Sequence, residues 1–214
     1  HDGLANVGSA VVGGFAEEAM KQYGDHDMAA VATLVSVICR AAGAPALDID
    51  LDRMQDESVI APTLEEALAR VPATTTTYLL AAKDQKKYRR AFPAFFERVA
   101  EVAAVDGALT DGVFLETLMP WLAAMGDSKA RPFRHAAAAA TLAVAKVLSD
   151  LVARADLAVT NAKNRKDAAD AKARLEDLVE RHRVVVSNTL HFRCKDACPE
   201  IRLHTFKVLR ELMM

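Results

Sequence analysis

A dense run of basic side chains between residues 83 and 90 is the strongest candidate for chemistry in this sequence. Five cations fall within eight residues that contain a single acid, Asp84. Such a surface can bind phosphates through charge and counterion release without reading bases. The alternative is an ordinary solvated helix face. We call this group the 83–90 basic cluster; it comprises Lys83, Lys86, Lys87, Arg89 and Arg90.

Cations also gather where a later helix is expected to begin. Helix N-termini attract anions, so basic residues there suit a bound phosphate, although they oppose the helix dipole. The alternative is a structural turn in which Arg134 pairs with a neighbouring acid. We call this group the 129–135 basic cluster; it comprises Lys129, Arg131, Arg134 and His135.

A further basic region is interspersed with acids, which is typical of a solvated helical hairpin rather than a binding surface. A binding role is the less favoured alternative for it. Its cations are Lys163, Arg165, Lys166, Lys172 and Arg174.

Two thiols and two imidazoles near the C-terminal end are ligand types that zinc accepts: His191, Cys194, Cys198 and His204. Their spacing is not that of a zinc knuckle, and Pro199 predicts a helix start that scatters them. Buried thiols in a helix–helix contact are the favoured interpretation. The sequence also lacks a nucleophile elbow, a phosphate loop and a His-Glu-x-x-His motif. We therefore expect no metal, no cofactor and no enzymatic activity.

The composition of the chain restricts the class of protein. Its 214 residues are 52% hydrophobic and 26% charged, with a net charge of −2, which indicates a soluble helical protein and excludes a globally basic nucleic-acid binder. No uninterrupted apolar run reaches the ~18 residues of a membrane span. Three cysteines do not suit a secreted disulfide framework and favour a reducing compartment. The first residue is not Met and neither end carries a clear boundary, so we expect a fragment of a longer protein.

The element that positions the 83–90 basic cluster is an amphipathic helix predicted over residues 84–106. Its apolar side chains recur at helical spacing, and the cluster falls on the opposite face, with Arg89 at its flank. Pro93 removes one backbone donor and predicts a kink or an early irregular turn there. The apolar stripe is formed by Tyr88, Phe92, Phe95, Phe96, Val99 and Val102.

The rest of the chain is also predicted to be helical. A helix pair over about 4–43 precedes an irregular region over 44–82, which includes a short helix starting near Pro62 and the threonine run 74–77. A long helical hairpin over 134–192 and a last helix from about Pro199 follow. The predicted fold class is all-α: a HEAT-like α-solenoid of antiparallel helix pairs with a long projecting hairpin, in a single domain over 1–214.

Three segments resemble the STAG (stromal antigen) family, the HEAT-repeat subunits of cohesin. The similarity covers nearly the whole chain, and the second and third segments carry most of its specificity. The segments are Asp84-Gln85-Lys86-Lys87-Tyr88-Arg89-Arg90-Ala91-Phe92, Ser128-Lys129-Ala130-Arg131-Pro132-Phe133-Arg134-His135 with the alanine-rich helix after it, and Arg193-Cys194-Lys195-Asp196-Ala197-Cys198-Pro199-Glu200-Ile201-Arg202.

This resemblance implies the N-terminal domain of a longer, nuclear and chromosomal protein that acts in sister chromatid cohesion. It implies contact with the duplex DNA backbone through Lys86 and Lys87, and binding of the cohesin kleisin and other subunits mainly beyond Met214. From both arguments we expect DNA contacts at Lys83, Lys86, Lys87, Arg89, Arg90, Lys129, Arg131 and Arg134. The alternative is a HEAT-type module that takes partner helices or peptides in an apolar groove and does not bind DNA.

Overall fold

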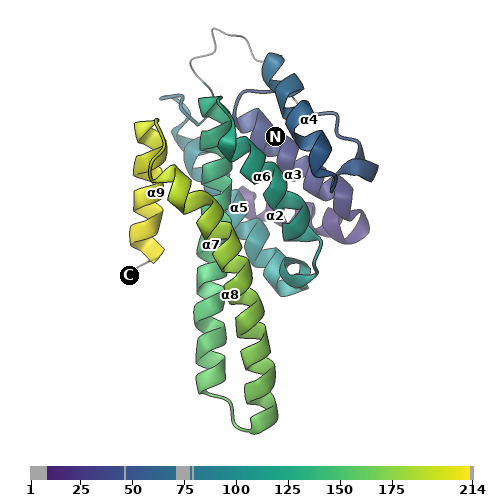
Figure 1. The fold of residues 1–214 in the computed structure, drawn as a ribbon, viewed down its shortest axis with the longest axis vertical. Coiled ribbons are helices and arrows are strands. Elements are labelled where there is room, and N and C mark those ends of the chain that lie inside the picture. The colour runs from purple at the N-terminus through teal and green to yellow at the C-terminus, as the bar shows by residue number, and fades with distance from the viewer. Residues whose placement is uncertain (1–8, 46, 71–77, 79, 213–214) are drawn as a thin grey trace.

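A computed structural model describes residues 9–45, 47–70, 78 and 80–212. In this part of the chain all regular structure is helical, as predicted, and the fold is a HEAT-like α-solenoid with a projecting hairpin (Figure 1). The elements are α2 (Ser9–Asp25), α3 (Asp27–Ala41), η1 (Leu51–Arg53), α4 (Glu57–Ala69), α5 (Lys86–Asp106), η2 (Ala108–Thr110), α6 (Phe114–Asp127), α7 (Arg131–Thr160), α8 (Arg165–Arg193) and α9 (Pro199–Leu212).

Helix α5 has the predicted apolar stripe on its buried side. Tyr88, Phe92 and Phe96 are fully buried, and the centroids of neighbouring rings in this series lie 5.9 and 5.1 Å apart. The helix runs without interruption through Pro93 to Asp106. Gly107 caps its end, with a φ of +84° that is a left-handed conformation glycine adopts without strain. The cluster-bearing helix is therefore held rigidly by its aromatic face.

Helix α7 is the centre of the fold. It packs against α3, α5, α6, α8 and α9, and its alanines 136–140 are all buried, because small side chains allow neighbouring helices to approach closely. By length and hydropathy α7 could cross a membrane, but 67% of its most apolar window is buried inside the protein. This is the pattern of a core helix.

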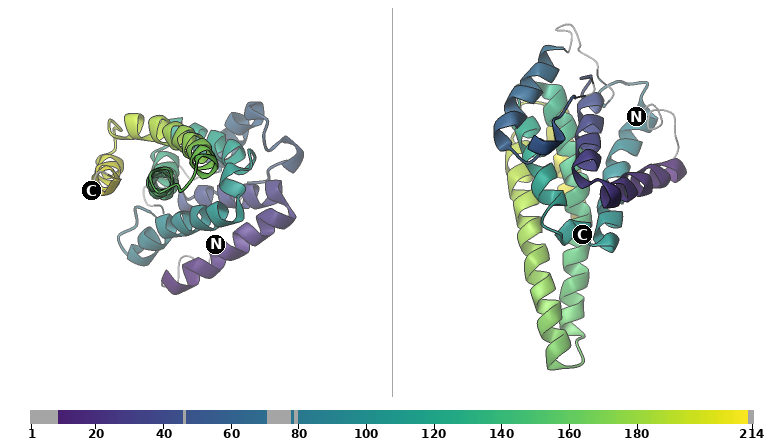
Figure 2. Two further views of the ribbon diagram at one scale, coloured as in Figure 1. Left: turned by 90° about the horizontal axis from the view of Figure 1, so that it is seen from below. Right: turned by 90° about the vertical axis from the view of Figure 1, so that its right-hand side faces the viewer.

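The hairpin formed by α7 and α8 extends well beyond the other helices (Figures 1 and 2). Asn164 begins α8 by accepting a hydrogen bond from the backbone N–H of Asp167 at 2.9 Å. Toward the tip the side chains are mostly exposed, as at Leu157, which is 60% exposed. The prediction of a hairpin projecting into solvent is thus confirmed.

The helix predicted to start near Pro62 begins five residues earlier. Asp56 accepts hydrogen bonds from the backbone N–H and the hydroxyl of Ser58, at 2.9 and 2.5 Å, and so caps α4 at Glu57. Pro62 then lies inside the helix. The prediction was wrong because it gave weight to proline at a first turn and missed the aspartate cap. The threonine run 74–77 and the first residues of the helix predicted from residue 4 lie outside the described residues.

Candidate nucleic-acid interface

The 83–90 basic cluster lies on α5 and on the turn before it, and all five side chains are exposed. None of the five forms an ion pair with another residue that the structure describes. The first turn of α5 has no acidic side chain, and Gln85 makes no side-chain capping bond there. The positive end of the helix dipole therefore adds to the charge of the lysines and arginines.

The 129–135 basic cluster has a different character, because two of its arginines are held by other side chains. Lys129 is exposed. Arg131 lies over the ring of Tyr78, 5.9 Å from its centroid, and its Nη2 is 3.4 Å from Glu200. Lys129 is thus the exposed cation of this cluster that no described side chain engages, whereas Arg131 is exposed but partly engaged.

Arg134 is part of a largely buried ion-pair network. Its Nε donates to Asp196 at 2.9 Å, and its Nη1 donates to the carbonyl oxygens of Ser128 and Lys129. Asp196 also accepts from Arg193 Nη1 at 2.6 Å and from the backbone N–H of Cys198 at 2.8 Å. The side chains of Arg134 and Asp196 are 16% and 1% exposed. This geometry favours the structural alternative for Arg134.

The acid at the centre of this network has a lowered pKa. Burial alone raises the pKa of Asp196, but the hydrogen bonds from Arg134 and from the Cys198 N–H, with the charges of Arg134 and Arg193, outweigh it. Asp196 is therefore a carboxylate at neutral pH and joins the end of α8 and the start of α9 to the first turn of α7.

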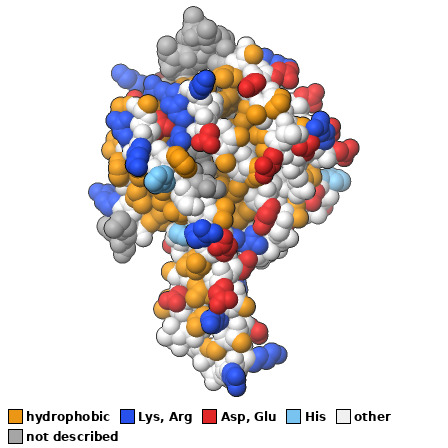
Figure 3. All heavy atoms as spheres, viewed as in Figure 1, with side chains coloured by type: hydrophobic (Ala, Val, Ile, Leu, Met, Phe, Trp, Pro, Cys, Tyr) orange, Lys and Arg blue, Asp and Glu red, His pale blue; other side chains and the backbone are white. Residues whose placement is uncertain are grey.

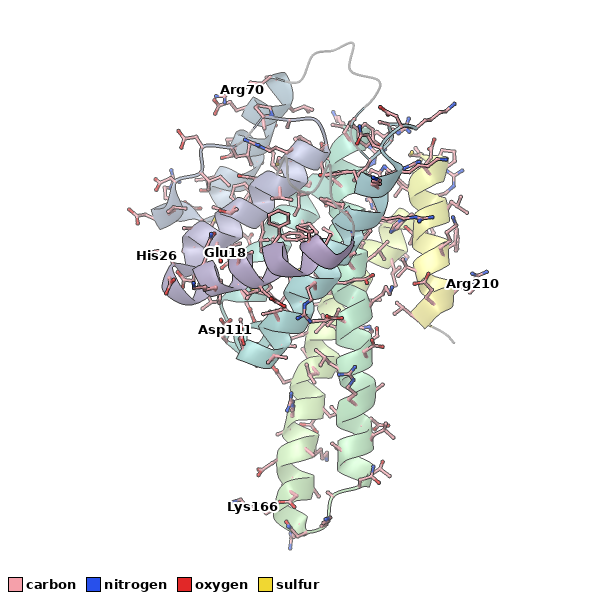
Figure 4. The ribbon with its side chains drawn as sticks, turned by 180° about the vertical axis from the view of Figure 1, so that it is seen from behind. Glu18, His26, Arg70, Asp111, Lys166 and Arg210 are labelled. Carbon is pink, nitrogen blue, oxygen red and sulfur yellow. The ribbon has the colours of Figure 1, made fainter. Side chains whose placement is uncertain are left out.

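The two basic clusters lie at the same end of the molecule. Tyr78, just before α5, lies with its hydroxyl 2.8 Å from Nδ1 of His135 on α7. The N-terminal ends of α5, α7 and α9 all lie at that end (Figures 1 and 4), and Lys and Arg side chains gather there (Figure 3). By contrast, Lys166 lies at the distant tip of the hairpin (Figure 4).

The remaining cations of the hairpin form a second exposed basic region rather than an extension of the first. Lys163, Arg165, Lys166 and Arg174 are exposed, and Lys172 lies 3.8 Å from Glu176 one turn later. Acids alternate with these cations, as the sequence indicated.

The structure places the residues considered as zinc ligands in other contacts or at the surface. The buried Cys198 packs with Ala138 and Ile201, and its Sγ donates to Glu200 at 2.8 Å. His191 is exposed, whereas Cys194 is partly buried. Among the described residues no three His, Cys, Asp or Glu side chains are grouped as a metal would require. Cys198 thus serves a helix–helix contact.

The His135 imidazole is expected to stay neutral at pH values well below the ordinary histidine pKa of about 6.5. Burial, with the nearby charges of His204 and Arg131, lowers its pKa to about 4. Below about pH 6.5 the unfolded chain binds a proton that the folded chain does not, so stability falls as the pH drops toward 4. Two-dimensional NMR of the imidazole signals tests this. A titration midpoint near 6.5 for His135 would contradict it.

Two features of this end of the molecule were not visible in the sequence. Asp196 and Arg193 belong to a segment that carries the family resemblance, but the sequence did not show that Asp196 accepts from Arg134, 62 positions away, as well as from Arg193. The contact of Tyr78, just before α5, with His135 on α7 was also not predicted, because nothing in the sequence marked Tyr78 beyond its aromatic side chain.

The fold defines a HEAT-type solenoid domain, and the exposed basic end of α5 is its candidate phosphate-binding surface. A family model described as the STAG domain matches residues 76–184. The chain belongs to this family.

A solved structure with the same fold is "Cohesin subunit Scc3 from Z. rouxii, 88-1035", with a TM-score of 0.74 and 17% sequence identity. The match covers 98% of this chain and 27% of that chain, so the present chain spans about a quarter of that length. No curated protein sequence matches.

Proposed function

We propose that this chain is the N-terminal helical domain of a longer HEAT-repeat cohesin subunit that contacts the backbone of duplex DNA. The STAG family membership and the fold shared with a chain named as a cohesin subunit support this proposal. The role is non-enzymatic and requires neither cofactor nor metal. Its setting is the nucleus and the chromosome, in sister chromatid cohesion.

The observation that carries the DNA contact is the state of the 83–90 basic cluster. Its five cations are exposed, lie at the positive end of α5, and have no ion-pair partner among the described residues. Phosphates can therefore bind them without breaking an existing pair, and release of condensed counterions favours the complex. Because backbone contacts carry no base information, the binding should not depend on sequence.

Lys129 is the residue of the 129–135 basic cluster that we include in the proposed surface. Arg131 is given a secondary place beside Lys129, because its guanidinium is partly engaged by Tyr78 and Glu200. We assign Arg134 a structural role. Scaffolding of the kleisin and other cohesin subunits is proposed to involve mainly regions beyond residue 214.

Charge reversal at Lys86 and Lys87 is expected to weaken DNA binding and flatten its salt dependence. Fluorescence anisotropy of a labelled duplex, titrated at about 50 and 200 mM salt, compares the chain with Lys86→Glu/Lys87→Glu. Loss of two phosphate contacts lowers the log–log salt slope by roughly 1.8, at about 0.9 per contact.

The matched control is Lys163→Glu/Lys166→Glu at the hairpin tip, which changes the net charge equally and is expected to leave both affinity and slope nearly unchanged. Equal binding by the Lys86→Glu/Lys87→Glu variant and the unmodified chain would remove α5 from the site. A larger loss in the tip variant would move the site to the hairpin.

A second function is favoured by a different observation. The apolar groove between α4, α6 and α8 suits a module that binds partner helices, and such a module need not bind DNA. The size of the salt dependence separates the two: binding of backbone phosphates weakens steeply with salt, whereas docking of an apolar stripe weakens less.

A further inference from the structure

Three helices that are distant in sequence enclose an apolar groove on the surface. Helices α4, α6 and α8 line it, and its volume is about 760 Å³. Its apolar walls come from all three helices, so the groove exists only in the folded chain. The apolar lining includes Ile60, Leu115, Met119, Ala123, Val184 and Val185.

The groove has a fixed floor and an accessible rim. Ile60, Met119 and Val185 are 4%, 8% and 1% exposed, so they belong to the packed core. Val184 on α8 is 39% exposed, and Ala61 on α4 is also exposed. A ligand that covers these exposed groups gains apolar burial without rearranging the floor.

The rim of the groove is acidic. Four carboxylates, of Glu57, Glu116, Asp177 and Glu180, line it with one guanidinium, that of Arg181. Arg181 is already held by Glu116 at 2.6 Å and by Asp177 at 3.0 Å.

One rim carboxylate has a cation of its own outside the groove: Glu180 pairs with Arg183 at 2.6 Å. Counting Arg183, the rim still carries two more negative than positive charges. Phosphates are repelled here, whereas lysines and arginines are attracted.

The dimensions of the groove match a short helix. On α6 the lining runs from Leu115 to Ala124, and on α8 from Asp177 to Val185. At 1.5 Å per residue these stretches are about 12–14 Å long, or about two and a half helical turns. Apolar side chains at positions i, i+4 and i+7 of an α-helix span a similar length.

We propose that this groove docks an amphipathic helix of a partner protein, with an apolar stripe flanked by lysines and arginines. The apolar walls take the stripe, and the carboxylates of the rim pair with the flanking cations. The site is separate from the DNA surface: acidic side chains border the apolar region over α4, α6 and α8, whereas basic ones gather toward the opposite side (Figure 3).

The test uses two labelled helical peptides of about 16 residues with the same leucine stripe, one flanked by lysines and one by glutamates. Fluorescence anisotropy is expected to show that the lysine peptide binds the chain about 10-fold or more tightly than the glutamate peptide. Ala61→Trp and Ala123→Trp, which fill the groove from α4 and from α6, are each expected to weaken the lysine peptide by about 10-fold or more.

The exposed position of Ala61 and two control variants show whether a loss of peptide binding comes from filling the groove. Ala61 is exposed, so Ala61→Trp keeps the fold even where Ala123→Trp does not. Ala173→Trp, on the exposed surface of α8 outside the groove, is expected to bind as the unmodified chain does. Lys86→Glu/Lys87→Glu is expected to keep peptide binding while its DNA binding weakens.

The proposal is overturned if neither peptide binds, if both bind equally, or if Ala61→Trp leaves binding of the lysine peptide unchanged. Analytical ultracentrifugation tests whether a second copy of this chain occupies the groove instead. A dimer that Ala61→Trp dissociates would assign the groove to a second copy of this chain and likewise overturn the proposal.

Discussion

Replacement of Trp121 by alanine is expected to lower the free energy of unfolding by about 3–5 kcal/mol. Trp121 is fully buried at the centre of α6, and its Nε1–H donates to the carbonyl oxygen of Met54 at 3.1 Å. The substitution leaves a large cavity and an unpaired buried carbonyl. It also removes one of the hydrogen bonds between the segment before α4 and α6, so the support of one wall of the groove is weakened.

Urea unfolding followed by circular dichroism measures this loss, since Trp121 is the single tryptophan and its fluorescence disappears with it. Trp121→Phe keeps most of the volume but removes the donor, and is expected to cost about 1–3 kcal/mol. Val105→Ala, at a side chain that is 85% exposed, is the control and should change stability by less than about 0.5 kcal/mol. A similar loss for Trp121→Ala and Val105→Ala would contradict a stabilising role for burial at Trp121.

Replacement of Asp196 by asparagine is expected to cost about 3–5 kcal/mol, because it leaves the guanidinium groups of Arg134 and Arg193 without their buried counter-charge. Both arginines donate to this carboxylate, at 2.9 and 2.6 Å. The cost should appear in urea unfolding. Asp127→Asn is a close control: its carboxylate lies 3.8 Å from the same Arg193 but is 77% exposed, so a change below about 0.5 kcal/mol is expected.

The pH dependence gives an independent check on Asp196. Its pKa in the folded chain lies below the ordinary value of 3.8, so the unfolded chain takes up the proton first as the pH falls. The stabilisation is present above about pH 4 and is lost as the pH falls through the folded pKa. In Asp196→Asn this acid-dependent loss should be absent. An unchanged acid limb in the variant would show that the network does not depend on this carboxylate.

The Asp196 network also bears on the DNA surface. A substitution at Arg134 removes a partner of a buried carboxylate, so a loss of DNA binding in such a variant would combine damage to the fold with loss of a contact. Lys86 and Lys87 have no such ion-pair partner among the described residues. They are therefore the residues at which DNA binding can be tested without disturbing the scaffold.

The local pattern of the sequence was sufficient to predict much of the helical framework. The aromatic residues from Tyr88 to Phe96 recur at helical spacing, and that spacing alone places Lys86, Lys87 and Arg90 on the exposed face. The acids interspersed with the cations from Lys163 to Arg174 indicated a solvated helical hairpin. Both predictions hold because side chains three and four residues apart share a helix face whatever the rest of the chain does.

The sequence by itself thus determined the helical class of this protein, the amphipathic character of α5, the exposure of the 83–90 basic cluster and the resemblance to the STAG family. Only the tertiary structure decided which cations are available and where partners can dock. Arg134 and Lys129 look equivalent in the sequence, yet one is held by an aspartate 62 residues away and the other faces solvent. The apolar groove needs α4, α6 and α8 together. Ion pairs and grooves between distant segments depend on how helices pack, and helical periodicity within one segment carries no information about that.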